Sequence, residues 1–497
     1  MIRRRTALTA TAAATLTGLA PAAWSQSKKD SLVLAMTLEP PGLDPTAGAA
    51  SAIAEVVQYN VLETLTKIRS DSTIAPLLAT SWTVTPDNKT WAFTLRPGVK
   101  FHNGEPFNAA TVKYAFERAV APDSTNKDKA VFANIVNMRA TDDLTIVITL
   151  KNTNPDFLFQ IGQATASIVE PRSAATNNTQ PVGTGPFKLD SWAKGNNLVL
   201  SRWDGHRDVK SIALRRVTIR FISDAAAQVA ALLAGDVDLF PRVSAARNLA
   251  QFRADKRFQV LVGGTRAKTV VAINNKKKPL DDVRVRRAIA MAIDRKQVID
   301  GVANGFGAPI GSFYVPGAPG YVDLTAVNAF NPDRARALLK EAGVTTPLEL
   351  SLKLPPAPYA RQGGEVIAAM LAKVGIVAKQ ENVEWAQWLS GVYGQKSYDL
   401  TIISHVEPLD FGNFARPGYY WNYENPKFNA LWDKINSTAD IKQRHALLAE
   451  AQRLVADDAV LAYLYQPTAI TVAAARLKGV WKDMPISAND LSALSWG

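Results

Sequence analysis

The sequence predicts an α/β protein, because short apolar strands and amphipathic helices both occur along it. Residues 399–403 (DLTII) form a β-branched, apolar run bounded by polar residues, which suits a buried strand of an α/β sheet. Residues 282–301 carry apolar side chains at helical spacing, which predicts one amphipathic helix. A hairpin pattern is also present, with strands over 82–84 and 91–95 and the turn sequence TPDNK between them.

The first 25 residues are typical of a secretory signal peptide. A basic start at 3–5 (RRR) precedes a small-residue, apolar stretch over 7–19, and AWS at 23–25 supplies a small-x-small cleavage site. The paired arginines resemble a twin-arginine signal, although TAL at 6–8 stands where Phe-Leu is usual. A membrane anchor, the alternative, needs a longer and less polar stretch. No cysteine follows the cleavage site to carry a lipid, so we expect the mature chain to be free in the periplasm.

Length and composition limit the remaining possibilities. The chain has 497 residues, no cysteine and a formal net charge of +13. A chain of this length can build two or more hydrophobic cores, and an exported protein without cysteine is held together by packing rather than by disulfides. Lys and Arg are scattered among acidic residues, with one short run at 276–278, so we expect a basic solvated surface and no nucleic-acid partner. No other long apolar run occurs, and we expect no membrane span.

Further elements follow along the chain. Residues 32–35 predict a strand, and apolar residues at helical spacing predict a helix over 51–65. A second helix is expected over 109–120, with Asn108 as its N-cap. The glycines of GTGP at 183–186 form a turn before a strand, because no helix and no Lys-Ser/Thr pair follows as in a phosphate-binding loop.

Several motifs together resemble one protein family. The stretch SWTVTPDNKTWAFTLRPGVKFHNGEPFNAATVKYAFERA is similar to the signature region of the family 5 extracellular solute-binding proteins, the periplasmic components of ABC importers for peptides, nickel and related solutes. LDP and PLLA precede it, and GTGPFKL, LAGDVD, VRVRRAI with AIDR, and ARALL with EAG follow it in the family's order. The resemblance covers nearly the whole mature chain.

The resemblance implies a two-lobed periplasmic binding protein fold of type II, cluster C. The first lobe would contain an extra inserted domain, and two crossing strands near 270–274 and 468–472 would form the hinge. The expected domains are a signal peptide at 1–25, lobe I at 26–64, its inserted subdomain at 65–182, lobe I again at 183–273, lobe II at 274–472 and a last part of lobe I at 473–497.

Catalytic motifs are missing from the sequence. There is no cysteine nucleophile, and none of the four histidines (His102, His206, His405 and His445) has a second metal ligand at helical spacing. Walker, Gly-x-Ser-x-Gly and His-Glu-x-x-His patterns do not occur. We therefore expect a binding protein without enzyme activity, cofactor or resident metal.

The candidate binding residues follow the strand at 399–403. Glu407, Asp410 and Arg416 come directly after it, interleaved with aromatic residues, and ligands of open α/β sheets bind beyond the carboxyl ends of strands. Carboxylates among aromatics suit a cationic or amine-bearing ligand. The alternative is a solvated loop whose aromatics fill a local core. The aromatic residues concerned are Phe411, Phe414, Tyr419, Tyr420 and Trp421.

The resemblance assigns roles to some of these residues. It implies that Glu407 holds the amine of a peptide-like ligand, with Asp410 as another acid of the same loop. The arginine that holds a peptide carboxylate in dipeptide-binding relatives corresponds here to Leu354, which leaves Arg361 and Arg416 as substitutes. The resemblance also suggests two further groups of residues: Trp385 and Trp388 as an aromatic wall of the cleft, and His405 either as a structural residue or as a contact to a nickel chelate.

The expected function is therefore capture of a peptide-like or amine-bearing small solute for an ABC importer. The partners would be a short peptide or other small molecule and the membrane permease subunits with their cytoplasmic ATPases, and the protein would act as a monomer. Two alternatives stay open. One is a nickel-chelate or glycoside ligand, and the other is a secreted chaperone or receptor that uses the same fold.

Overall fold

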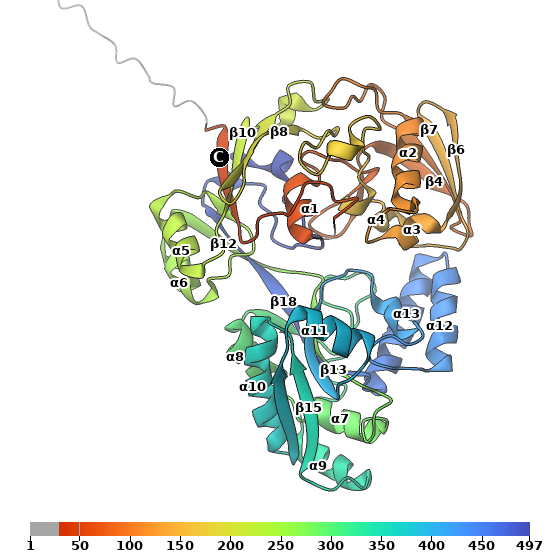
Figure 1. Ribbon diagram of the computed structural model, residues 1–497, viewed down its shortest axis with the longest axis vertical. Helices are drawn as coiled ribbons and strands as arrows, with labels where there is room; N and C mark the ends of the chain where they lie inside the picture. Colours follow the sequence, from red (N-terminus) through yellow and green to blue (C-terminus); the bar gives the residue numbers. More distant parts are fainter. Residues whose placement is uncertain (1–28, 49) are drawn as a thin grey trace, which may run out of the picture.

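The computed structural model of the protein describes residues 29–48 and 50–497, which form two lobes (Figure 1). The expected signal peptide and its export route lie outside the described residues. One sheet runs through both lobes in the strand order β16-β15-β17-β13-β18-β11-β1-β10-β9-β8, with β12 and β14 also paired to β18. We call the upper lobe of Figure 1 lobe I and the lower lobe, with β13–β17, lobe II. The two-lobed α/β fold is as predicted.

Lobe I contains the first strand and most of the first half of the chain. Its part of the large sheet has β1 as a central parallel strand, paired to β10 on one side and to β11 on the other. Its strands in this sheet are β1 (Ser31–Met36), β8 (Phe187–Ala193), β9 (Asn197–Arg202), β10 (Arg216–Phe221), β11 (Leu239–Phe240) and β12 (Phe258–Gly264). Its helices outside the separate sheet described next are α1 (Ser51–Val57), α4 (Phe157–Gln160), α5 (Ala225–Ala234) and α6 (Leu249–Ala254).

A separate antiparallel sheet of four strands lies at one end of lobe I, in the order β4-β5-β7-β6. It contains the expected hairpin, because β4 (Ala79–Val84) pairs with β5 (Thr90–Leu95). The expected helix is α2 (Ala109–Val120), and Asn108 caps it by accepting a hydrogen bond from the Thr111 backbone. The remaining elements here are β2 (Thr66–Ile68), β3 (Ile74–Pro76), β6 (Ile135–Asp142), β7 (Thr145–Leu150) and α3 (Lys129–Ala133).

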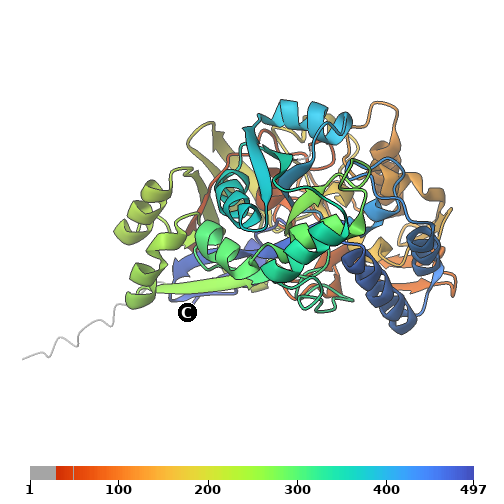
Figure 2. The same cartoon turned by 90° about the horizontal axis from the view of Figure 1, so that it is seen from below.

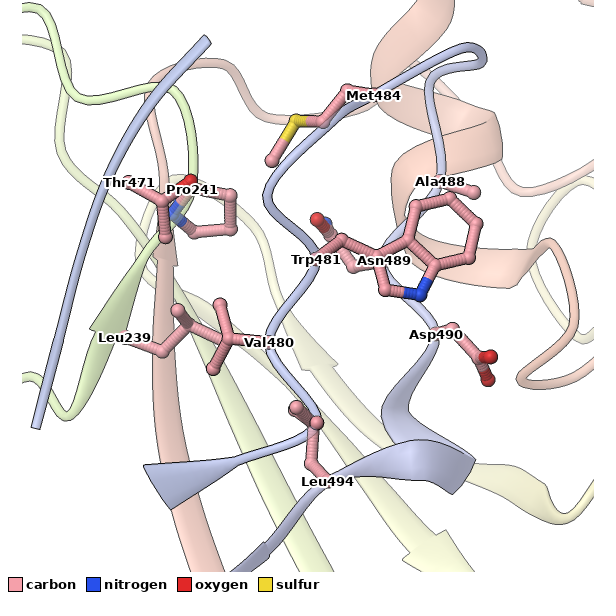
Figure 3. A pocket seen from close by; sticks show the side chains of 11 residues that line it. Leu239, Pro241, Thr471, Val480, Trp481, Met484, Ala488, Asn489, Asp490 and Leu494 are labelled. Carbon is pink, nitrogen blue, oxygen red and sulfur yellow. The ribbon is translucent and has the colours of Figure 1, made fainter. Parts of the chain in front are cut away.

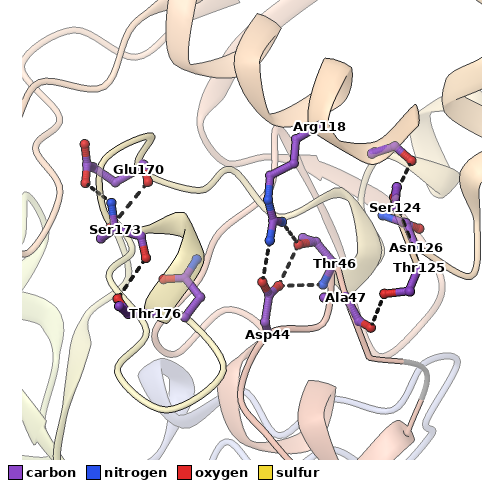
Figure 4. A network of polar contacts seen from close by, with 12 residues as sticks. Asp44, Thr46, Ala47, Arg118, Ser124, Thr125, Asn126, Glu170, Ser173 and Thr176 are labelled. Atoms are coloured by element: carbon purple, nitrogen blue, oxygen red, sulfur yellow. Dashed lines mark hydrogen bonds and ion pairs between the residues drawn. The ribbon is translucent and has the colours of Figure 1, made fainter. Parts of the chain in front are cut away.

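Polar contacts fix this sheet region to the start of the chain. The Asp44 carboxylate accepts hydrogen bonds from the Thr46 backbone (2.9 Å) and hydroxyl (2.6 Å), and it pairs with Arg118 of α2 at 3.0 Å (Figure 4). Arg118 also bonds the Thr46 hydroxyl. The Leu-Asp-Pro motif of the sequence is therefore a structural lock between two parts of lobe I.

Lobe II places β17 (Leu400–His405) between β13 (Lys268–Ile273) and β15 (Leu348–Leu354). Two groups of helices pack on it, and from below the green and teal group lies apart from the dark-blue pair (Figure 2). The remaining elements are β14 (Gly307–Pro309), β16 (Ile376–Asn382), α7 (Val283–Met291), α8 (Arg295–Ala303), α9 (Pro332–Glu341), α10 (Pro358–Ala372), α11 (Trp385–Gln387), α12 (Pro426–Ser437) and α13 (Ile441–Asp457).

The connection between the lobes is built on β18 (Leu461–Ala474). Its second half pairs with β12 of lobe I over 468–474, and its first half pairs with β13 of lobe II over 461–465. The other strand is interrupted at the crossing, where residues 265–267 link β12 to β13. The first crossing therefore lies several residues before the expected 270–274, while the second falls beside the expected 468–472. The limits of the expected domains stay a prediction.

Two predicted helices are shorter in the structure. The helix expected over 51–65 ends at Val57, because Tyr59 adopts a positive φ of 64° and the Asn60 side chain bonds to carbonyl groups at Val56 and Asn489. The helix expected over 282–301 is divided into α7 and α8. Asp294 begins the second one as its N-cap, with its carboxylate accepting from the amides of residues 296 and 297. Apolar spacing alone did not reveal this cap.

The glycine turn at 183–186 is a close backbone contact, as expected of a turn. A Cβ on Gly183 would lie 1.9 Å from the Val61 carbonyl oxygen, and one on Gly185 would lie 2.3 Å from that of Asn60. His102 holds the turn from the other side: the Gly183 amide donates to Nδ1 (3.3 Å), and Nε2 bonds the Gly185 carbonyl (2.9 Å). This pairing requires a neutral imidazole with its proton on Nε2.

The C-terminal segment returns to lobe I and packs against β11 and β18. A small space remains there, and Leu239, Val480, Trp481 and Asn489 are among the residues that line it (Figure 3). Its volume of about 20 Å³ suits a water molecule and is far below that of a solute site. Within 29–48 and 50–497, no helix has both the length and the apolar character that a membrane crossing requires.

The His102 contacts predict a loss of stability in weak acid. Burial lowers the pKa of His102 to about 4, although its bond to the Gly185 carbonyl acts in the opposite direction. Between a pKa of about 6.5 for the unfolded chain and about 4 for the folded one, only the unfolded chain gains the proton, so stability falls as pH falls through this window. The histidine accounts for up to about 3 kcal/mol of this loss.

Urea denaturation at a series of pH values checks this prediction. The free energy of unfolding should depend less steeply on pH between about 6.5 and 4 in His102→Gln than in the wild type. Equal slopes for the two proteins would show that His102 does not stay neutral in the folded state.

Candidate functional site

The candidate site begins where β17 ends, on the side of lobe II that faces lobe I. The strand is buried along its length, as expected for residues 399–403, and its last residue is His405. A loop over 406–410 follows, and then a 3-10 turn at Phe411–Phe414. In Figure 1, α11 lies at the edge of lobe II next to lobe I.

The aromatic residues after this strand form a core rather than a ligand surface. Phe414 and Trp421 stack with their ring centroids 4.8 Å apart, and Tyr420 stacks on His405 at 6.0 Å. Phe411, Phe414, Tyr420 and Trp421 are each at most 3% exposed. The alternative interpretation of the sequence, that the aromatics fill a local core, is therefore correct for these four residues.

The negative charge of Asp410 is balanced by an ion pair with Lys268. Its Oδ1 lies 2.5 Å from the Lys268 ammonium group, and both side chains are almost fully buried. Burial raises the pKa of the Asp410 carboxyl, but Lys268 and His405 together outweigh this effect through charge and hydrogen bonding, and the pKa lies below its usual range. A buried pair of this kind fixes the loop to β13. Asp410 therefore has a structural partner within the chain.

His405 also belongs to this buried cluster. Its Nε2 lies 2.9 Å from the Tyr420 hydroxyl, and its Nδ1 lies 3.4 Å from Oδ2 of Asp410. The ligand atoms of His405, Glu407 and Asp410 lie within 4.8 Å of one another, a spacing that a metal ion could bridge. The Lys268 ammonium group already forms an ion pair with Asp410 and repels a second cation. These three residues therefore do not fit a metal ion.

Glu407 differs from Asp410. Its side chain is exposed, and among the described residues its carboxylate accepts only a 3.2 Å bond from the neighbouring Val406 amide. The backbone carbonyl of Glu407 accepts a hydrogen bond from Lys268 at 2.6 Å, which positions the loop. Across the described chain, no Lys, Arg or His forms an ion pair with the Glu407 carboxylate. It is the uncommitted acid of this loop.

Exposed apolar side chains lie on this loop and on residues 385–393. We call Trp385, Leu389, Tyr393, Val406 and Leu409 the apolar wall, since each is at least 37% exposed. Tyr393 packs edge-on against Tyr419 at 5.7 Å. Burial, the Tyr393 phenol and the charges of Asp410 and Glu407 together raise the pKa of Tyr419, so the Glu407 charge acts on the ring that contacts Tyr393 of the wall.

The two tryptophans have different roles. Trp388 is 5% exposed, and its Nε1 donates to the Thr401 hydroxyl at 3.0 Å, so it supports β17 from within the lobe. Trp385 packs edge-on against it at 6.0 Å and is 43% exposed. Of the aromatic pair expected to line the cleft, only Trp385 presents its ring to solvent.

The expected arginines are not buried ligand clamps. Arg361 pairs with Glu384 at 3.1 Å on an exposed surface, and Arg416 is exposed over the Tyr419 ring at 5.5 Å. Leu354, which stands where the resemblance leads one to expect an arginine, is 1% exposed and packs in the core of lobe II.

Two basic residues of the first crossing were missed in the sequence. Lys268 and Arg266 precede the apolar run of β13, and in extended chain residues two apart point to the same side. Both are less than 9% exposed, and both line one small space with Pro408 and Asp410. Two basic residues at alternate positions, directly before a buried strand, were the signal that could have revealed them.

A cavity of about 280 Å³ also opens at Arg266, next to the crossing strands. Its lining comes from both lobes: residues 70–72, Gly264, Asp483 and Pro485 from lobe I, Thr265 and Arg266 from the link, Gln466 from β18 and Pro316 with Gly317 from lobe II. A space between lobes, next to the strands that join them, is where a two-lobed protein can enclose a ligand.

The fold and this interlobe site define a two-lobed solute-binding protein of the periplasmic-binding type. Residues 73–426 match the model of the bacterial extracellular solute-binding proteins, family 5 Middle, and the chain belongs to this family. Its members bind peptides or other small ligands and work with ABC permeases and their ATPases; they are not enzymes.

Individual relatives are similar to this protein over almost the whole chain. The probable D,D-dipeptide-binding periplasmic protein DdpA of Escherichia coli K12 is 29% identical over 475 residues, which is 90% of each chain. The dipeptide-binding protein of the same organism is 27% identical over 93% of this chain and 94% of its own. Among solved structures, AgaA of Agrobacterium tumefaciens R10 with agropinic acid superimposes with a TM-score of 0.78 at 26% identity, covering 94% of this chain and 99% of AgaA.

The buried pair predicts a large loss of stability for one acid of the loop and almost none for the other. Asp410→Asn leaves the Lys268 ammonium group buried without a counter-charge, and breaking such a pair typically costs about 3–5 kcal/mol. Glu407→Gln removes an exposed carboxylate without an ion pair and should change stability by less than about 0.5 kcal/mol. Chemical denaturation of both variants measures this difference. An Asp410→Asn protein as stable as the wild type would show that Lys268 finds another partner.

Proposed function

We propose that this protein is a periplasmic solute-binding protein that captures a peptide-like or amine-bearing small solute between its lobes and delivers it to an ABC importer. The observation that carries this proposal is the Glu407 carboxylate, which has no cationic partner within the described chain and lies beside the apolar wall. An acid in this position suits the ammonium group of a ligand, and the apolar wall suits variable side chains.

Other features agree with a peptide-like solute. Relatives similar over nine-tenths of the chain are named for dipeptides, and one solved relative was crystallised with the peptide STSA. Another relative is named as nickel-binding. In this chain the Lys268 ammonium group at Asp410 opposes a metal contact, which favours an organic solute. The expected signal peptide and the periplasmic relatives support export to the periplasm.

Glu407→Gln should weaken solute binding strongly. In a closed cleft the ligand ammonium group is separated from water, and removing its ionised partner costs on the order of 2–5 kcal/mol. This corresponds to a loss of affinity of roughly thirty-fold to several-thousand-fold. Native mass spectrometry of gently purified protein identifies the bound solute, and calorimetry then measures its affinity for each variant.

Glu365→Gln is the matched control. Glu365 is an exposed acid of α10 without an ion pair across the described residues, so the variant loses the same charge outside the cleft. Its affinity should equal that of the wild type. If Glu407→Gln also binds within about threefold of the wild type, the amine contact lies elsewhere or the solute has no positive group.

The protein should close around its solute by rotation of the lobes about the two crossings. A buried site between two rigid lobes has to open for loading, and among the described residues only the link at 265–267 and β18 join the lobes along the sheet. Small-angle X-ray scattering should give a smaller radius of gyration with saturating solute than without it. An identical radius in both states contradicts a hinge motion.

A further inference from the structure

Arg266 is a buried cation that the chain itself does not neutralise. It is 8% exposed and forms no ion pair or side-chain hydrogen bond with any of the residues the structure describes. Burial lowers the pKa of Arg266 to about 10, and the only influence in the opposite direction is the Tyr314 phenol. The guanidinium group therefore keeps its charge at neutral pH without an ion pair to any carboxylate of the described residues.

The other buried arginines show that this is an exception. Arg286 is 7% exposed, and its guanidinium group donates to the carbonyl oxygens of Leu280, Asp281 and Asp458. Arg444 is 6% exposed and pairs with Asp156 at 2.6 Å. A buried cation without such partners is costly, because it has lost water and gained nothing in exchange.

Arg266 lines space that a ligand could enter. It lines both the interlobe cavity of about 280 Å³ and the smaller space that it shares with Lys268, Pro408 and Asp410. Asp71 and Asp483, the acids of the larger cavity, accept hydrogen bonds from Thr73 and from the Gly264 amide, and neither acts on the ionisation of Arg266. Lys268 is neutralised by Asp410.

The backbone at Arg266 is held in place. The Thr265 hydroxyl donates to the Pro467 carbonyl at 2.7 Å, and the Gln466 amide donates to the carbonyl oxygens of Thr265 (2.7 Å) and Pro316 (3.0 Å). These contacts join the link to β18 and to lobe II. The guanidinium group is thus presented from a fixed point between the lobes.

We propose that Arg266 is the binding site for a carboxylate group of the solute. A planar guanidinium group with two parallel donors matches a carboxylate, and an anion there would supply the counter-charge that the fold omits. This inference rests on the proposed function, which it extends: with Glu407 for the amine, the solute is a zwitterion such as a short peptide with free ends. It also explains how the chain can bind a carboxylate although Leu354 stands where dipeptide-binding relatives have an arginine.

Calorimetry with two probes tests the assignment. Alanyl-alanine carries both charges, and alanyl-alanine amide lacks the carboxylate. The wild type should bind the acid at least thirty-fold more tightly than the amide, and Arg266→Gln should bind the two with nearly equal affinity. Arg266→Lys, which keeps the charge without the fork, should give an intermediate ratio. Glu407→Gln should weaken both probes and leave their ratio unchanged.

The control is Arg453→Gln, which removes one exposed arginine of α13 that has no ion pair among residues 29–48 and 50–497. It should keep the wild-type ratio of acid to amide. An Arg266→Gln protein that also keeps this ratio overturns the assignment. A lower melting temperature of Arg266→Gln without ligand does so too, because removing an unpaired buried charge should not destabilise the fold.

A third probe separates this inference from the proposed function. If the wild type binds neither dipeptide probe, the solute is not a simple dipeptide, and sodium acetate then tests Arg266 alone against sodium chloride at equal ionic strength. Acetate should raise the melting temperature of the wild type more than that of Arg266→Gln. Equal shifts in the two proteins would mean that Arg266 does not bind a carboxylate.

Discussion

The architecture depends on the continuity of β18, which gives hydrogen bonds to the sheets of both lobes. Its fourteen residues pair with β12 through one half and with β13 through the other, so a single strand belongs to two rigid bodies. The partner strand is interrupted over only three residues, 265–267. When the lobes rotate, the backbone torsion angles of these three residues can change while the strand pairing on either side remains. The ion pair between Asp156 of lobe I and Arg444 of lobe II is a second, breakable link.

Within lobe II, Asp410 forms a buried ion pair, whereas Glu407 has no ion pair among the described residues. Lys268 stands at the start of β13 and bonds both the Asp410 carboxylate and the Glu407 carbonyl, which fixes the loop after β17. Asp410 is thus buried in a structural ion pair, while the Glu407 carboxylate stays exposed to solvent. The buried aromatics that follow the loop, Phe411 and Phe414, pack against each other with ring centroids 5.3 Å apart and fix its far end in the core. The position of Glu407 thus follows from contacts that Glu407 itself does not make.

Local sequence signals predicted the elements whose causes are local. The hairpin at β4 and β5, the Asn108 cap of α2 and the buried strand β17 each follow from residues within a few positions of one another. The break between α7 and α8 was missed, because apolar spacing continues across Asp294. Contacts between distant residues left no pattern to detect: Lys268 and Asp410 are 142 positions apart. For the same reason, composition alone could not separate Glu407 from Asp410.

Closure and charge are connected through the position of Arg266. A guanidinium group on the link between two rotating lobes loses water as the lobes approach, and its charge becomes more costly to bury. On the assignment proposed above, the solute carboxylate removes this cost at the moment of closure, so closed and liganded states favour each other. A ligand without the carboxylate would meet the uncompensated charge and leave the open state favoured. No separate sensor is needed, since the residue that recognises the anion is also the one that opposes closure in its absence.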